Sequence, residues 1–178
     1  MTLFRNGRAT PDDWTRVTDA DPLPADKHIV LSKARLIADR ETLRGRNSPL
    51  GVVLASGENL DGIEEDLTRL SLVVLDIPKY ADGRLYSVAR LLRERHGFSG
   101  EIRATGDVLR DQIMHLHRVG VDAFDVTHEG TIAALRAGTI VAPSLHTQAA
   151  ARESEETRDA GRPWRRVSPR GSVPGVKG

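Results

Sequence analysis

Acidic and basic side chains gather in one stretch near the middle of the chain, where an α/β fold usually has apolar residues or plain turns. Glu101 and Arg103 alternate with apolar residues, so a strand here would carry two opposite charges on one face. Asp82 and Arg84 flank a glycine at one predicted helix start, and Asp107 follows a glycine at the next. Open α/β sheets build their ligand sites at strand ends and helix starts. We therefore expect a charged site in this stretch.

The chemistry that this site could carry out depends on which of its side chains come together. Arg84, Arg103 and Arg110 can form a pocket for a small oxyanion, because guanidinium groups bind such ions through paired donors. Asp111 lies with Arg110 in the first turns of a predicted helix and can reach the same edge. The acids can instead serve as a general acid or base in a charged cleft. The candidate binding residues are Asp82, Arg84, Glu101, Arg103, Asp107, Arg110 and Asp111.

Each of these motifs also has a purely structural interpretation. Asp82, followed by glycine, is typical of a turn that leads into a helix. Asp107 is typical of a helix cap, and a cap occupies the N–H groups that an anion would need. Glu101 and Arg103 would be a weak surface pair on an edge strand, but on a central strand they must be paired or face a cleft. The sequence leaves these alternatives open.

The elements that must position these residues follow a βα rhythm. Strands alternate with helices, which favours a mainly parallel sheet with right-handed crossovers. The five βα units are too few for a closed eight-unit barrel. We expect an α/β fold with a flavodoxin-like doubly wound sheet, and the alternative is an open half-barrel of βα units. The predicted strands are 28–32, 50–55, 72–77, 101–105 and 122–126, and the predicted helices are 33–43, 59–70, 84–96, 107–119 and 131–137.

Composition divides the chain into three parts. Residues 1–27 are predicted to form an N-terminal hairpin around Asn6-Gly7 and a proline-containing linker. Residues 28–142 form the α/β domain, and residues 143–178 a frayed helix followed by a disordered basic tail. Five basic side chains and no acid fall in the last part of this tail, whereas the whole chain carries a net charge of +1. The folded part is therefore mildly acidic, and a nucleic-acid surface is not indicated there.

Several classes of function are excluded or not indicated by the residues. The chain of 178 residues has no cysteine, which excludes disulfides, thiolate metal sites and iron–sulfur ligation through cysteine. No cofactor is identifiable, because the glycine-rich nucleotide loops and the serine nucleophile elbow are missing, and the histidines lack metal-site spacing. No stretch approaches the ~18 apolar residues of a membrane span, and no apolar signal core follows Met1. We expect a soluble cytoplasmic protein.

A string of motifs in the charged stretch resembles a known family. It reads DGR, LLRER, GE, GDVLRDQ and DAF, in this order, between Asp82 and Phe124. These residues closely resemble a bacterial family of unknown function, whose members are typically encoded beside sulfite reductase and are labelled probable oxidoreductases of sulfite reduction. The resemblance covers roughly residues 3–126. The chain departs from the family at Tyr80-Ala81, where the family often has phenylalanine and a hydroxyl residue.

The resemblance implies an accessory protein of assimilatory sulfite reduction, which binds a small oxyanion or a partner reductase such as sulfite reductase. Reduction of sulfite itself is not expected, because the six electrons require a sirohaem or iron–sulfur system that this chain cannot ligate through cysteine. Two alternatives remain open at this point. One is an enzyme with a charged Asp/Glu/Arg cleft, and the other is a non-catalytic α/β scaffold with a structural ion-pair network.

Overall fold

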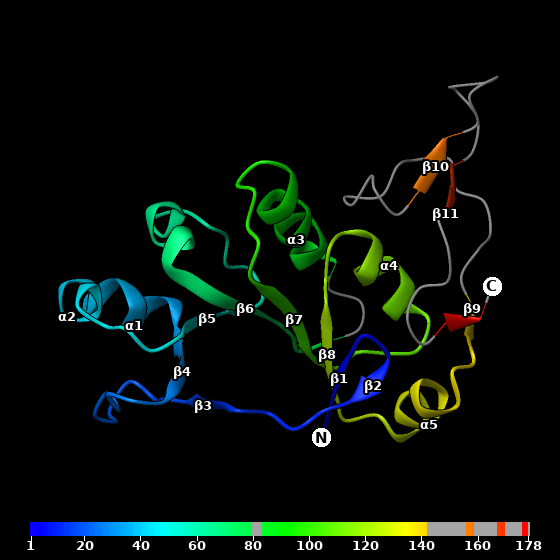
Figure 1. Cartoon of the computed structure of the whole chain (residues 1–178), viewed down its shortest axis with the longest axis horizontal. Helices are drawn as coiled ribbons and strands as arrows, with labels where there is room; N and C mark the ends of the chain where they lie inside the picture. The colour runs from blue at the N-terminus through cyan, green and yellow to red at the C-terminus, as the bar shows by residue number, and fades with distance from the viewer. Residues whose placement is uncertain (80–82, 142–155, 159–166, 170–175, 178) are drawn as a thin grey trace.

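One curled sheet of eight strands forms the centre of the computed structural model, which describes residues 1–79, 83–141, 156–158, 167–169 and 176–177 (Figure 1). The strands of this sheet are β1 (Thr2–Arg5), β2 (Arg8–Ala9), β3 (Trp14–Arg16), β4 (His28–Ser32), β5 (Leu50–Leu54), β6 (Leu70–Ile77), β7 (Glu101–Gly106) and β8 (Ala123–Val126). Their order across the sheet is β2-β1-β8-β7-β6-β5-β4-β3. Strands β3 to β8 are parallel, and β1 is antiparallel to both of its neighbours.

In the described part of the chain, the helices cover one face of the sheet and none lies on the other face. They are α1 (Lys33–Ala38), α2 (Arg40–Arg44), α3 (Arg84–Glu94), α4 (Gln112–Arg118), α5 (Glu129–Ala137) and the 3₁₀ helix η1 (Glu64–Arg69). Helix α3 shows why: Leu85, Val88, Ala89 and Leu92 fall on one stripe and are buried. The main core joins these side chains to one face of the strands, while the opposite face has its own small apolar cluster.

The sequential strand order corrects the predicted topology. The flavodoxin-like doubly wound prediction is wrong, because such a sheet reverses its strand order, whereas β4 to β8 follow one another in sequence. Right-handed crossovers that all step in the same direction place their helices on one face. The open half-barrel, held as the alternative, describes the sheet. The count of five βα units is not confirmed, because Gly62, with φ +82°, interrupts the predicted helix 59–70 and leaves only η1.

The short connection between β2 and β3 explains the curl of the sheet. These two strands lie at opposite edges of the sheet. Eight strands laid flat would put the edges about 34 Å apart. The chain from Ala9 to Trp14 can span at most about 18 Å when fully extended. The sheet must therefore bend until its edges approach, and the segment Thr10–Asp13, which we call the strap, crosses the open side opposite α3 (Figure 1).

The two ends of the chain compare differently with the predicted domain boundaries. The hairpin predicted at Asn6-Gly7 corresponds to β1 and β2, with these residues at φ 49° and 71° between the strands, whereas residues 14–16 of the predicted N-terminal segment pair with β4 as part of the main sheet. Most of the predicted frayed helix and disordered tail, 143–178, lies outside the described residues. The parts that are described are β10 (Glu156–Arg158), β11 (Val167–Pro169) and β12 (Val176–Lys177); β10 pairs with β11, and β12 pairs with β9 (Ile140–Val141). Among the described helices, none has the length and apolar character needed to cross a membrane.

Candidate functional site

The helix-free face of the sheet, which we call the open face, carries a small apolar cluster at its centre. Val30, Val53, Leu72 and Val74 are buried there, and Trp14 of β3 packs against them. They alternate along their strands with residues of the main core, because successive strand side chains point to opposite faces. Apolar residues on both faces give the near-continuous apolar runs that predicted these strands.

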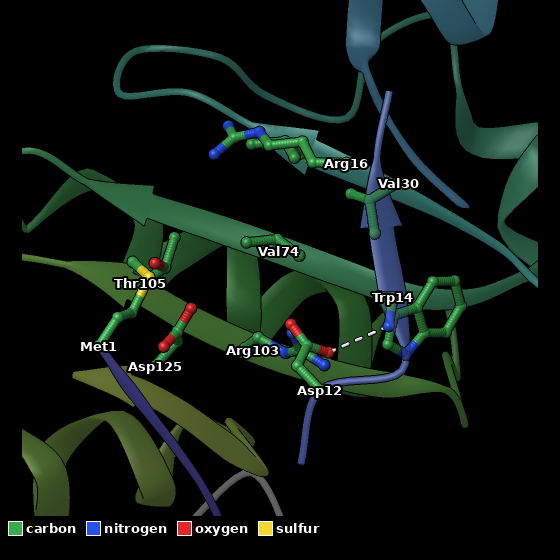
Figure 2. A pocket seen from close by; sticks show the side chains of 10 residues that line it. Met1, Asp12, Trp14, Arg16, Val30, Val74, Arg103, Thr105 and Asp125 are labelled. Carbon is green, nitrogen blue, oxygen red and sulfur yellow. Dashed lines mark hydrogen bonds and ion pairs between the residues drawn. The ribbon is translucent and has the colours of Figure 1, made fainter. Parts of the chain in front are cut away.

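A pocket of about 200 Å³ lies on this open face (Figure 2). Its floor contains Val30, Val53 and Val74, from three neighbouring strands. Its polar lining comes from elements on both sides of this floor: Asp12 of the strap, Arg16 of β3, Arg103 and Thr105 of β7, and Asp125 of β8. An apolar pocket with a few convergent polar groups is the usual form of a small-molecule site.

Four charged residues form a continuous chain of ion pairs beside the pocket. Arg5 donates from Nε to Oε2 of Glu101 at 2.6 Å. Arg103 donates from Nε to the other oxygen of Glu101 at 2.9 Å and from Nη1 to Oδ2 of Asp12 at 2.8 Å. The remaining nitrogen, Nη2, lies 2.9 Å from Oε1 of Glu101 but forms no hydrogen bond there. The chain joins β1, β7 and the strap, which are far apart in sequence.

The predicted pairing of Glu101 with Arg103 is realised on an interior strand. Strand β7 lies between β6 and β8, and the Arg103 side chain is only 4% exposed. A charge this deeply buried requires partners, and Glu101 and Asp12 supply them. Arg103 is therefore held by its two carboxylates, and its positive charge is compensated within the protein. The sequence pattern pointed to Glu101 as a partner but did not reveal Arg5 or Asp12.

Three polar side chains around the pocket keep their hydrogen-bonding capacity. Arg16 is exposed. Thr105 and Asp125 are directly paired positions on β7 and β8 and face the pocket together. Within the part of the chain that the structure describes, these three side chains make no hydrogen bond or ion pair with another residue. They are therefore the groups that a ligand could engage without displacing a protein contact.

The Asp125 carboxyl has an unusual environment for an aspartate. Burial raises its pKa above the ordinary value, and the nearby negative charge of Asp12 raises it further, while the positive charges of Arg103 and of the N-terminus at Met1 oppose both effects. A carboxyl with a raised pKa in a pocket is a candidate for proton donation to a ligand. The sequence signal for this residue is an acid between two apolar residues, Phe124 and Val126, inside the predicted strand 122–126, and Asp125 is not among the predicted site residues.

The raised pKa of Asp125 predicts how stability depends on pH. The folded protein holds this proton more tightly than the unfolded chain, so the stabilising effect is complete below the ordinary aspartate pKa and is lost as pH rises through the raised value. An Asp125→Asn variant stays neutral throughout. Its free energy of unfolding, relative to wild type, is expected to increase between about pH 4 and about pH 7. Denaturant unfolding measures this difference, with exposed Asp26→Asn as control; a difference that stays constant with pH contradicts the prediction.

The other predicted site residues lie elsewhere. Arg110 donates to the carbonyl oxygen of Thr139 at 3.0 Å, and Arg84 begins α3 with a terminal nitrogen close to Gly57. Arg103 points to the open face from the middle of β7. The structure does not bring the three predicted arginines together.

The acids of the predicted site are separated as well. Glu101 begins β7, whereas Asp107 follows its end, about 20 Å further along an extended strand. Asp107 does not cap the next helix as expected; its N–H donates to the carbonyl oxygen of Ile77 at 2.7 Å, and the helix begins later, at α4, with Asp111 at its N-cap position. Asp82 lies outside the described residues. Of the candidate residues that the structure describes, only Glu101 and Arg103 belong to the open face.

The described residues contain no group of three metal-ligating side chains.

A comparison with family models finds one match, to a family described as a bacterial protein of unknown function, over residues 51–156. The matched region contains β5 to β8, and so Arg103, Thr105 and Asp125, whereas the strap and β3 precede it. No curated protein matches the chain.

Proposed function

The chain belongs to a bacterial protein family of unknown function (DUF934), and on this basis we propose that it binds a small oxyanion in the open-face pocket as an accessory protein of assimilatory sulfite reduction. The observation that carries the binding part is the exposed Arg16 guanidinium opposite the Thr105 hydroxyl and the Asp125 carboxyl. The link to sulfite reduction is supported by the motif string from Asp82 to Phe124, which resembles proteins typically encoded beside sulfite reductase.

The charges around the pocket favour an anion at Arg16. A guanidinium can bind two oxygens of an oxyanion through parallel N–H donors. Thr105 can donate from its hydroxyl, and Asp125 can donate when it is protonated, a state that its raised pKa favours. Arg103 serves a different purpose, because Glu101 and Asp12 already compensate its charge. The oxyanion is thus assigned to a different arginine from the three that the sequence pointed to.

Substitution of Arg16 tests this proposal. Arg16→Gln is expected to weaken binding of sulfite and sulfate by about tenfold or more, because charge-assisted hydrogen bonds are lost. Isothermal titration calorimetry with each anion measures the effect. Arg44→Gln is the matched control, since Arg44 is an exposed arginine on α2 paired with Glu41, away from the pocket. Absence of binding to wild type, or equal binding by both variants, would contradict the proposal.

The accessory role is tested separately from the anion site. If the protein acts beside a reductase, affinity purification from its native host is expected to recover sulfite reductase with the wild-type chain. Identification of the recovered proteins by mass spectrometry measures this. A purification that repeatedly recovers no reductase, from cells grown on sulfate as sulfur source, would remove the partner part while leaving the anion site to be judged by calorimetry.

A second candidate function is a non-catalytic scaffold whose charges are structural. The specific observation in its favour is the ion-pair chain, in which Arg5 and Glu101 are 96 positions apart and Asp12 and Arg103 are 91 apart. A double-mutant cycle on Glu101 and Arg103 tests whether this pair is structural. Coupling between the two substitutions in the free energy of unfolding supports the structural role, and absence of coupling contradicts it. The oxyanion proposal is tested separately, at Arg16.

A further inference from the structure

We infer that the ligand of the open-face pocket is a small organic acid with a short unbranched apolar body, and not a bare inorganic oxyanion. The inference rests on the proposed anion site at Arg16 and specifies the class of molecule that this site accepts. It comes from the valine floor, which an inorganic anion would not use. The anionic group would lie at Arg16, and the apolar body would lie across the floor toward Thr105 and Asp125.

The first step concerns the valine floor of the pocket, which separates the polar groups on its two sides. Val30, Val53 and Val74 belong to β4, β5 and β6, which lie between β3 on one side and β7 on the other. Figure 2 shows Val74 between Arg16, above it, and Arg103, below it. A ligand that contacts both polar sides of the pocket must therefore cross an aliphatic surface. Polar atoms placed over that surface would lose water without gaining a hydrogen bond.

The size of the pocket carries the second step. Its volume of about 200 Å³ corresponds to about six or seven water molecules at the density of the liquid. An inorganic oxyanion held at Arg16 would leave water against the valines. An apolar chain would displace this water, and transfer of apolar surface out of water is favourable. A chain of a few carbons attached to an acidic group matches both the floor and the volume.

The third step concerns the charge of the ligand. The charged groups that line the pocket favour a ligand with a single negative charge. Arg16 is a pocket cation that no described residue pairs, Asp12 holds its negative charge beside Arg103, and the Asp125 carboxyl lies near the positive N-terminus of Met1. A ligand with two negative charges would place one of them close to these two carboxyl groups. A monoanionic sulfonate or carboxylate avoids this repulsion and still offers two or three oxygens to the guanidinium.

A series of alkanesulfonates tests the inference on the wild-type protein. Calorimetric titration would compare sulfite and sulfate with methane-, ethane-, propane- and butanesulfonate at constant ionic strength. Affinity is expected to rise about two- to fourfold with each added methylene group and then to level off when the pocket is full. Sulfate or sulfite binding as tightly as butanesulfonate, with no dependence on chain length, would overturn the inference while leaving the proposed anion site intact. No binding of any member would overturn both.

A valine variant locates the effect in the floor. Val74→Thr keeps the shape of the side chain and adds a hydroxyl, so the gain for each methylene group is expected to fall while the affinity for methanesulfonate stays within about twofold. Val119→Thr is the matched control, because Val119 is half-buried at the end of α4 and does not line the pocket. A chain-length dependence that is unchanged in Val74→Thr would place the ligand elsewhere and overturn the assignment. If Val74→Thr does not fold, the alkanesulfonate series on the wild-type protein still tests whether the ligand has an apolar body.

Discussion

Replacement of Glu101 with alanine is expected to lower the free energy of unfolding by about 3 kcal/mol. The reason is the environment of Arg103, whose side chain is 4% exposed and donates from Nε to the Glu101 carboxylate at 2.9 Å. Without Glu101, the ion pair that this buried positive charge keeps is the one with Asp12, which is itself partly exposed. Arg5 also loses its ion-pair partner. Urea denaturation followed by circular dichroism measures the change.

Two further variants show whether the buried charge of Arg103 is the cause of the destabilisation expected for Glu101→Ala. Arg103→Met is expected to cost less than Glu101→Ala, about 1–2 kcal/mol, because Glu101 keeps Arg5 and no buried charge is left without compensation. Glu94→Ala removes an acid that pairs with Arg90 at 2.9 Å on the surface of α3, and is expected to cost less than about 1 kcal/mol. If Glu101→Ala costs no more than Glu94→Ala, the ion-pair chain does not stabilise the fold.

Replacement of Gly106 with alanine is expected to destabilise the protein by at least about 3 kcal/mol. Gly106 ends β7 with φ +97°, a conformation that L side chains rarely adopt. A Cβ atom there would lie 2.3 Å from the carbonyl oxygen of Ile77. That same oxygen accepts a hydrogen bond from the N–H of Asp107, so it cannot move away without breaking the link between β6 and β7. Thermal and urea unfolding of the variant measure the loss.

Gly45→Ala is the matched control for this substitution. Gly45 has φ −86° at the end of α2, and a Cβ atom there would meet nothing within 4 Å. This variant is expected to change stability by less than about 1 kcal/mol. Equal stability of the Gly106→Ala and Gly45→Ala variants would show that the turn after β7 can adjust, and that Gly106 is not required there.

The sequence predicted the strands more reliably than the helices between them. All five predicted strands of the α/β domain are present, because apolar runs bounded by glycine, proline or charged residues are strong local signals. The predicted helix 107–119 is shortened to α4. The N–H of Asp107 donates to the carbonyl oxygen of Ile77, and the Gly106 backbone lies against the same oxygen, so neither residue can join the helix. That contact joins two strands, and a local pattern does not contain it.

The candidate site was predictable only in part. The alternation around Glu101 and Arg103 correctly placed both charges on one face, because a strand has a side-chain period of two. Which residues would meet them depended on the neighbours of β7. Asp125 lies next to Thr105 by strand register, while Arg5 reaches Glu101 because β1 is added to the sheet beside β8. The predicted oxyanion cluster did not form, since Arg84 and Arg110 follow the ends of β6 and β7, whereas Arg103 points to the open face from the middle of β7.

By itself, the sequence determined the α/β class, strands β4 to β8, the hairpin at Asn6-Gly7 and the charged pair on β7, because each of these depends on residues close together in the chain. The tertiary structure decided the strand order, the bare face and the pocket. The physical reason is the strap, whose few residues must connect the two edges of an eight-stranded sheet. That requirement curls the sheet and brings Asp12 and Arg16 to the open face, opposite Arg103 and Asp125.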